Sequence, residues 1–484
     1  MRRMRAVPRS AAQEGVVGGL AARARQAWAP ENQMRGAVFA GALLLEVVSA
    51  VFGGASQGNA PGLMAVEIAS LPLLFVSLCL VLAGAAPKAA TAPMLLLAAI
   101  VAVPLLQLVP LPADVWSHLP GRDLEARIVA AVGLGRPSLP FSLAPEDTWR
   151  AAMALAPPAA MFLGALFLGD GQRRALAATW LALALISLGL GVLQMLGGPD
   201  SPLYLYQITN PGSPVGLFAN RNHQATLLFA LMPMAAMFTV GFRGRFEDAR
   251  AVRALLAVLY IVIAIVGVAV TRSRAGVVLS GLAIVGVAAV IARGGTFRRR
   301  WRAAAGVAIG ALAAVGAVLI FALGPILERF GEGGEPRFQG WPLVERAAMA
   351  FMPLGSGIGS FQAVYGQAEP LIQVSPIYFN HAHNEYLELW LETGVVGAAL
   401  LLAFVAWLGA RMAAIWGRRA NEAEGDLAAA ASVLVLLVAA HSAVDYPLRT
   451  EAIAVLFAFA CACLIAPAPI MPAGDTAAAV RRRA

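Results

Sequence analysis

The feature that most constrains this chain is a series of apolar segments, each long enough to cross a lipid bilayer. A membrane-spanning helix needs roughly 17–25 predominantly apolar residues, and about twelve segments of this kind lie between residues 36 and 468. Of the whole chain, 60% is hydrophobic and only 13% is charged, whereas soluble domains are about 45–50% apolar and about 25% charged. The sequence therefore predicts an all-α polytopic membrane protein with about 12 transmembrane helices.

The basic residues indicate how the chain is threaded through the membrane. An even number of spans places both ends on one side. If that side is the cytoplasm, most of the 36 Lys and Arg residues fall in cytoplasmic segments, as the positive-inside rule expects. This distribution accounts for the net charge of +9 and argues against a nucleic-acid partner. The longest polar segments then lie on the outer side of the membrane.

The same threading divides the chain into four parts. We expect a basic cytoplasmic tail, a group of N-terminal membrane helices with one outer loop, a second membrane domain with a large outer loop that bears short helices, and a cytoplasmic C-terminal tail. The expected bounds are 1–35, 36–197 with the loop 111–148, 198–468 with the outer loops 198–222 and 325–393, and 469–484.

Residues 380–394 gather chemically active side chains in an otherwise apolar chain, on a predicted short amphipathic helix that ends at its final glycine. His381 and His383 have the H-x-H spacing of some metal ligands, but no cysteine lies nearby, and one histidine of such a pair is often a buried capping residue. We favour His383 as a general base, because a neutral imidazole accepts a hydroxyl proton once a neighbour fixes its tautomer. The candidate neighbours are Asn384 and Glu388, which share a helix face, or a carboxylate of an outer loop.

Two arginines stand in a turn too short to keep them far from the hydrocarbon. Arg272 and Arg274 fall between two apolar segments on the outer side, and drawing such a charge toward the bilayer centre costs about 2.5–3.5 kcal/mol. An anion should offset that cost. It is either a carboxylate such as Glu46 or Glu67, or a lipid-linked phosphate or diphosphate, which guanidinium groups bind in a bidentate manner. With Arg221, the two arginines favour the phosphate alternative.

Further polar motifs fall on the same side. His223 follows Arg221 at the start of an apolar segment. His441 and Asp445 stand four residues apart, so they support either a catalytic pair or a hydrogen bond at a helix end. The glycine-rich run 355–361 lacks the strand and the glycine spacing of a dinucleotide-binding loop. It predicts a turn before a short helix, where the backbone can approach a sugar or a phosphate. We expect no bound metal and no cofactor.

Taken in order, these motifs resemble the O-antigen ligase and O-antigen polymerase superfamily of bacterial envelope glycan assembly. The resemblance extends from about residue 210 to residue 447 and leaves the N-terminal third without a diagnostic motif. The motifs are N-R-N-H at 220–223, S-R-A-G at 273–276, G-S-G-I-G-S-F at 355–361, H-A-H-N-E-Y-L-E-L-W-L-E-T-G at 381–394 and D-Y-P-L at 445–448.

The resemblance implies a membrane glycosyltransferase of the C-type helical class at the periplasmic face of the bacterial inner membrane. It implies that a glycan carried on undecaprenyl diphosphate passes to a hydroxyl without a metal and with inversion at the anomeric carbon. Carried over to this chain, Arg221, Arg272 and Arg274 would hold the donor diphosphate, and His383 would act at the acceptor hydroxyl.

The acceptor remains open at this stage. A ligase transfers to lipid A core, a polymerase transfers to another lipid-linked repeat, and related enzymes transfer to Ser or Thr of a protein. A transporter of lipid-linked oligosaccharides is a further alternative. It is less favoured because transporters carry ionisable residues near mid-membrane, whereas most of those in this chain stand at the outer ends of the apolar segments.

Overall fold

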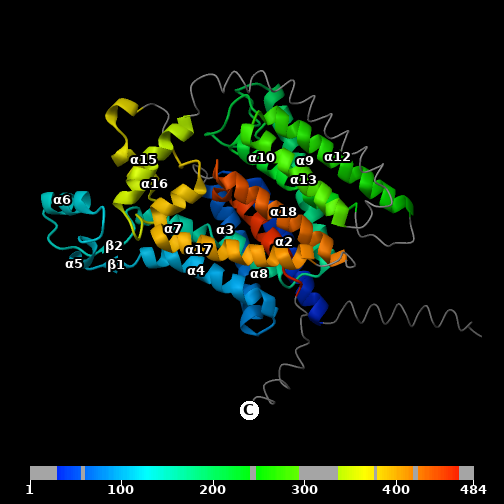
Figure 1. Cartoon of the computed structure of the whole chain (residues 1–484), viewed down its shortest axis with the longest axis horizontal. Helices are drawn as coiled ribbons and strands as arrows, with labels where there is room; N and C mark the ends of the chain where they lie inside the picture. The colour runs from blue at the N-terminus through cyan, green and yellow to red at the C-terminus, as the bar shows by residue number, and fades with distance from the viewer. Residues whose placement is uncertain are drawn as a thin grey trace, which may run out of the picture.

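The computed structural model describes residues 30–55, 60–239, 247–293, 336–374, 379–417 and 423–467. Nearly all of the ordered structure in these ranges is helical. The one sheet found there is a short antiparallel pair of β1 (Pro110–Leu111) and β2 (Leu139–Pro140). Figure 1 shows long helices packed roughly side by side, with smaller elements gathered at one end. The predicted all-α class is confirmed.

Within the described residues, seven helices are long and apolar enough to cross a membrane. The chain is thus a multi-pass membrane protein. The seven are α2 (Pro30–Phe52), α3 (Ala60–Leu82), α4 (Thr91–Gln107, preceded by η1, Lys88–Ala90), α9 (Asp170–Leu196), α12 (Glu247–Thr271), α13 (Arg274–Arg293) and α17 (Glu385–Gly417). Two further apolar helices are shorter, namely α18 (Ala423–Ser442) and α19 (Glu451–Cys463).

The predicted count of about twelve spans is not confirmed. Two of the expected spans are broken into pairs of short helices, α7 (Pro145–Met153) with α8 (Ala156–Ala165), and α10 (Arg221–Ala230) with α11 (Met232–Met237). Proline stands in the first turn of both α8 and α11, where it is tolerated, whereas inside a continuous helix it would remove a hydrogen bond. The expected span at 303–324, most of the tail 1–35 and the tail 469–484 lie outside the described residues.

The long helices pack in two neighbouring groups. In one, α19 and α8 pack together with α2 and α3, and in the other, α10 and α11 pack among α12, α13 and α18. Small residues permit close approach, as is common between membrane helices. A Cβ at Gly164 would crowd Leu73 of α3, and one at Gly286 would overlap Val433 of α18. This packing holds α10 in the interior, where almost every residue is buried.

The smaller elements lie at one end of the structure (Figure 1). They include α5 (Ala113–Trp116) and α6 (Asp123–Ala131) on the segment 111–148, and α15 (Pro336–Ala350), α16 (Phe361–Ala368) and η2 (Leu371–Gln373) on the segment 325–393. Of these, α15 and α16 pack on α17. A separate apolar cluster, with Val344, Phe361 and Leu391 in it, joins α15 and α16 to the first turns of α17. The described part of 325–393 therefore forms short helices that support the start of α17.

The break expected at the glycine of residue 394 is a kink inside α17. Gly394 has φ 55° and ψ −137°, so the helical geometry is interrupted there and resumes in the following residues. A Cβ at Gly394 would overlap the carbonyl group of Pro353, and the amide of Val395 donates to that same carbonyl at 2.9 Å. The kink therefore sets the angle between the short polar helix and the apolar span.

Replacing Gly394 by Ala should destabilise the protein severely. A backbone conformation this sparsely populated costs roughly 1–3 kcal/mol for a residue with a Cβ, and the overlap with Pro353 adds to it. Gly133→Ala is the matched control, because Gly133 also has a positive φ but faces open space. We expect a much larger fall in thermal unfolding temperature and in membrane abundance for Gly394→Ala. Equal falls for the two variants would contradict the packing role of the kink.

Candidate functional site

The first turn of α17 is fixed by Asn384. Its Oδ1 accepts hydrogen bonds from the backbone amides of Tyr386 and Leu387, each at 3.1 Å. A side-chain oxygen in this position satisfies amides that the helix itself leaves without a partner. Asn384 thus caps the helix and fixes the position of the preceding residue, His383.

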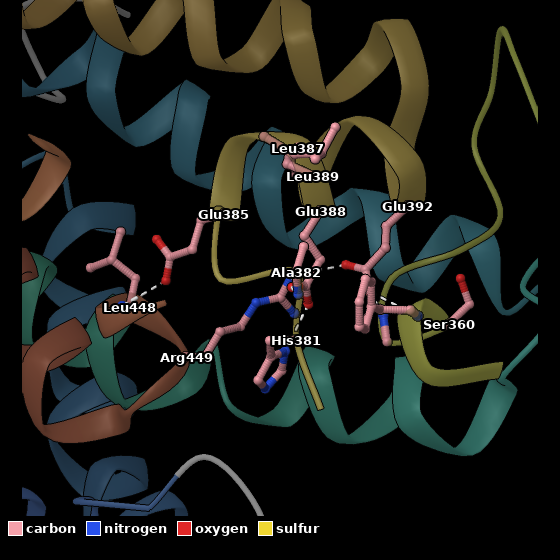
Figure 2. A network of polar contacts seen from close by, with 12 residues as sticks. Ser360, His381, Ala382, Glu385, Leu387, Glu388, Leu389, Glu392, Leu448 and Arg449 are labelled. Carbon is pink, nitrogen blue, oxygen red and sulfur yellow. Dashed lines mark hydrogen bonds and ion pairs between the residues drawn. The ribbon is translucent and has the colours of Figure 1, made fainter. Parts of the chain in front are cut away.

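Glu388 lies on the buried side of this turn and binds the other histidine. One carboxylate oxygen accepts from Nδ1 of His381 at 2.8 Å, and the other accepts from the amide of Ala382 at 2.8 Å. The side chain is 1% exposed. Figure 2 shows the carboxylate directed at the loop that carries His381. This carboxylate therefore binds His381, the other histidine of the H-x-H pair.

The negative charge of the α17 glutamates is offset by a guanidinium group that the sequence motifs did not predict. Nη2 of Arg449, on η3 (Pro447–Arg449), lies 2.9 Å from Glu392 and 3.2 Å from Glu388. Burial opposes the charge on Arg449, but the two carboxylates outweigh it and hold the pKa of the guanidinium above its ordinary value. Glu385 accepts from the amide of Leu448 at 2.8 Å. These contacts join α17 to the turn after α18.

The glycine-rich run 355–361 packs against the same helix. The amides of Ser356 and Gly357 donate to backbone carbonyls of Leu391 and Glu392 at 3.0 and 2.9 Å, and the amide of Gly359 donates to the Glu392 carboxylate at 2.8 Å. As predicted, the run leads into a short helix, α16. Its role as a surface for sugar or phosphate is not supported, because these amides already bind α17.

Asp445 brings together the residues expected to support the site. It is fully buried, and its Oδ2 accepts from Nδ2 of Asn222 at 2.5 Å. Its carboxylate oxygens also lie 4.0 Å from Nε2 of His223 and 3.9 Å from Nε2 of His441. On the other side of the His441 ring, Nδ1 is 2.7 Å from the hydroxyl oxygen of Thr226. The start of α10 and the end of α18 thus meet at one carboxylate.

Tyr446 connects this cluster to the loop before α17. Its ring centroid lies 5.0 Å from that of His223, 4.5 Å from that of His381 and 4.9 Å from that of His383. Its hydroxyl accepts from Nδ2 of Asn380 at 3.3 Å. His383 has a left-handed backbone, with φ 52°, which is uncommon for a residue other than glycine and often marks a functional constraint. Three chain segments therefore meet at one tyrosine.

The predicted diphosphate-binding arginines stand at the ends of helices that pack on one another. Arg221 begins α10, Arg274 begins α13, and Arg272 lies exposed between α12 and α13 with φ 55°. A Cβ at Gly276 would touch Ala225, so the starts of α10 and α13 are at the same end. The carboxylate oxygens of Glu46, an alternative partner, accept no hydrogen bond from any described residue.

A family model described as O-antigen ligase matches residues 259–402. Residues 259–402 are thus similar to an O-antigen ligase domain. The match supports the superfamily predicted from the motifs and a glycan-transfer role in polysaccharide assembly, as a membrane enzyme of the glycosyltransferase kind. No curated protein matches the chain.

The range matched by the family model holds only part of the polar residues described above. Arg272, Arg274 and His383 fall inside the matched range, whereas His223, Asp445, Tyr446 and Arg449 fall outside it. Among the described residues, no group of three or more His, Cys, Asp or Glu side chains could hold a metal ion. The matched range therefore contains only part of the cluster, and α10 and the turn after α18 supply the rest.

The sequence carries an indirect signal for a cation such as Arg449. Glu385, Glu388 and Glu392 recur at spacings of three and four, so they occupy one helix face. A stripe of carboxylates buried on a helix requires a cation nearby. Tyr446 carried no comparable signal, because an aromatic residue beside a buried aspartate is as consistent with ordinary packing as with a site.

Proposed function

We propose that this chain transfers a glycan from undecaprenyl diphosphate to an acceptor hydroxyl, as an O-antigen ligase-like enzyme of lipopolysaccharide or surface polysaccharide assembly. The reaction would take place at the periplasmic face of the bacterial inner membrane, with inversion and without a metal. The observation that carries the proposal is the convergence of His381, His383, His223 and Asp445 on Tyr446, at the end of α10 where the arginines stand.

Arginine suits the donor half of this reaction. Diphosphate is a good leaving group, so the protein mainly has to stabilise the negative charge that grows as the glycosidic C–O bond breaks. Arg221, Arg272 and Arg274 are the proposed ligands, because a guanidinium group binds phosphate oxygens in a bidentate manner. Arg272 supports this role best, since its exposed side chain is available to a lipid-linked donor.

An imidazole suits the acceptor half. His383 is the proposed general base. It removes the hydroxyl proton while the hydroxyl oxygen attacks the anomeric carbon on the face opposite the leaving diphosphate. Such an attack inverts the configuration at that carbon. The half-buried setting of His383, with its ring against Tyr446 and Phe379, supports the role because it limits the ways in which the imidazole can turn.

The polymerase alternative uses the same donor and differs in the acceptor, and both belong to the superfamily that the match supports. A strain that lacks this gene distinguishes them. We expect the deletion to accumulate undecaprenyl-linked polymer that is not transferred to the surface acceptor, measured by mass spectrometry of extracted lipids and by gel analysis of surface glycans. The intact gene should restore transfer.

Other outcomes of the deletion would change the assignment. Single unpolymerised repeats on the lipid carrier would indicate a polymerase. Lipid-linked glycan held on the cytoplasmic face would indicate a transporter, and unchanged lipid-linked and surface glycans would contradict all three functions.

A further inference from the structure

His381 has the geometry of a proton acceptor. Its Nδ1 is 2.8 Å from a carboxylate oxygen of Glu388. Its Nε2 is buried and forms no hydrogen bond with any described residue. The residue as a whole is 8% exposed. A buried ring nitrogen without a partner is costly unless the site uses it, so Nε2 needs a role that the contacts within the chain do not supply.

Glu388 fixes which nitrogen of His381 can accept a proton. The carboxylate also accepts from the amide of Ala382 and lies 3.2 Å from Arg449, and these contacts favour its charged form. A charged carboxylate next to Nδ1 keeps the proton on that nitrogen and leaves Nε2 as the acceptor. It also stabilises the imidazolium that forms once Nε2 is protonated.

Tyr446 places His381 beside the proposed base. The rings of His381 and His383 both tilt against the ring of Tyr446, with interplanar angles of 44° and 38°. Only Ala382 separates the two histidines in sequence, and the left-handed backbone of His383 turns the chain between His381 and the start of α17. Both imidazoles thus contact one aromatic ring, and Nδ1 of His381 has the Glu388 carboxylate at hydrogen-bonding distance (Figure 2).

We propose that His381 is a second proton acceptor in the transfer reaction, an inference that rests on the proposed function. The acceptor hydroxyl gives its proton to His383 as its oxygen bonds to the anomeric carbon, and the electron pair of the breaking C–O bond leaves on the diphosphate. The proton then passes from His383 to Nε2 of His381, whose imidazolium is paired with the Glu388 carboxylate. His383 is neutral again and ready for the next acceptor, and His381 releases the proton to water.

The pH dependence of this step reflects every ionisable group around the imidazole. Besides Glu388, the groups that face His381 or its carboxylate partner come from α10, α17, η3 and the loop itself. They are His223, His383, Glu385, Glu392, Tyr446 and Arg449.

The test compares a glutamine substitution at each member of the His381–Glu388 pair with the same substitution at a nearby glutamate. His381→Gln keeps an N–H group that can donate to Glu388 but has no ring nitrogen to accept a proton, and Glu388→Gln removes the carboxylate. Glu385→Gln is the control, because Glu385 lies on the same turn and accepts from Leu448 instead. Transfer by the purified full chain is measured against pH with an undecaprenyl-diphosphate glycan donor and saturating acceptor.

We expect turnover to fall about tenfold or more in His381→Gln and in Glu388→Gln, within the range of acid–base effects, with little change in the acceptor KM. The double variant should be no slower than the slower single variant, because the two side chains act as a unit. The acid limb of the pH profile should change in both single variants, and turnover at the pH optimum should fall less in Glu385→Gln than in either of them.

Each alternative outcome is decisive. Turnover of His381→Gln within twofold of the unaltered protein at every pH would overturn the role of His381 while leaving the proposed function intact. No transfer by the unaltered protein from this donor would instead overturn the proposed function and the inference with it. If Glu388→Gln does not fold, the pH profile of His381→Gln alone decides, since that variant keeps the hydrogen bond.

Discussion

Replacing His383 by Ala is expected to abolish detectable glycan transfer while the protein stays folded in the membrane. A well-placed general base contributes about 10²–10⁴-fold to a rate, and the proposed mechanism has no other group that takes the proton directly from the acceptor. The ring of His383 is half-buried on the loop before α17, tilted against Tyr446 and edge-on to Phe379. Its loss should therefore have little effect on the fold.

His383→Gly separates the imidazole from the backbone at this position. Because φ is 52°, glycine suits the conformation better than alanine does, so His383→Gly removes the ring without adding strain. His118→Ala is the control, since His118 is an exposed histidine on the segment 111–148. Transfer is measured with the lipid-linked donor, and folding by size-exclusion chromatography in detergent. Near-normal transfer by His383→Gly would show that His383 is not the base.

The sequence predicts the class of fold well and the partners within the site poorly. Length and hydropathy are local properties, so the apolar helices and the polar turn at the start of α17 follow from the sequence. A proline alone does not show whether an apolar segment is one helix or two, since α3 continues through Pro72 and α4 through Pro104, whereas the segments with α8 and α11 divide near theirs. That is why those two segments were predicted as single spans.

The partners of Glu388 show what helical spacing leaves undetermined. Spacing places Glu388 on one face of α17, but the residue it meets depends on the path of the preceding loop, which turns back at His383. Arg449 and Tyr446 reach the site from more than fifty residues away in sequence. The packing of α18 and α19 brings them there, and no local pattern reports that packing.

Replacing Arg272 or Arg274 by Lys should reduce transfer nearly as much as replacing it by Ala, by about 10²–10³-fold for a group that stabilises a leaving anion. Lysine keeps the charge but loses the planar pair of donors that fits a diphosphate. Arg272→Gly tests the charge without a backbone effect, because glycine suits the φ of 55°. Transfer is again measured with the lipid-linked donor.

Arg293→Lys is the control for this series, since Arg293 stands at the opposite end of α13 and its guanidinium group lies over the ring of Trp416. Its transfer rate should remain close to that of the unaltered protein. If Lys at residue 272 or 274 supports full transfer, bidentate binding of the diphosphate at that position is wrong. If Arg272→Gly also transfers normally, Arg272 plays no part in donor binding, and Arg221 and Arg274 must hold the diphosphate without it.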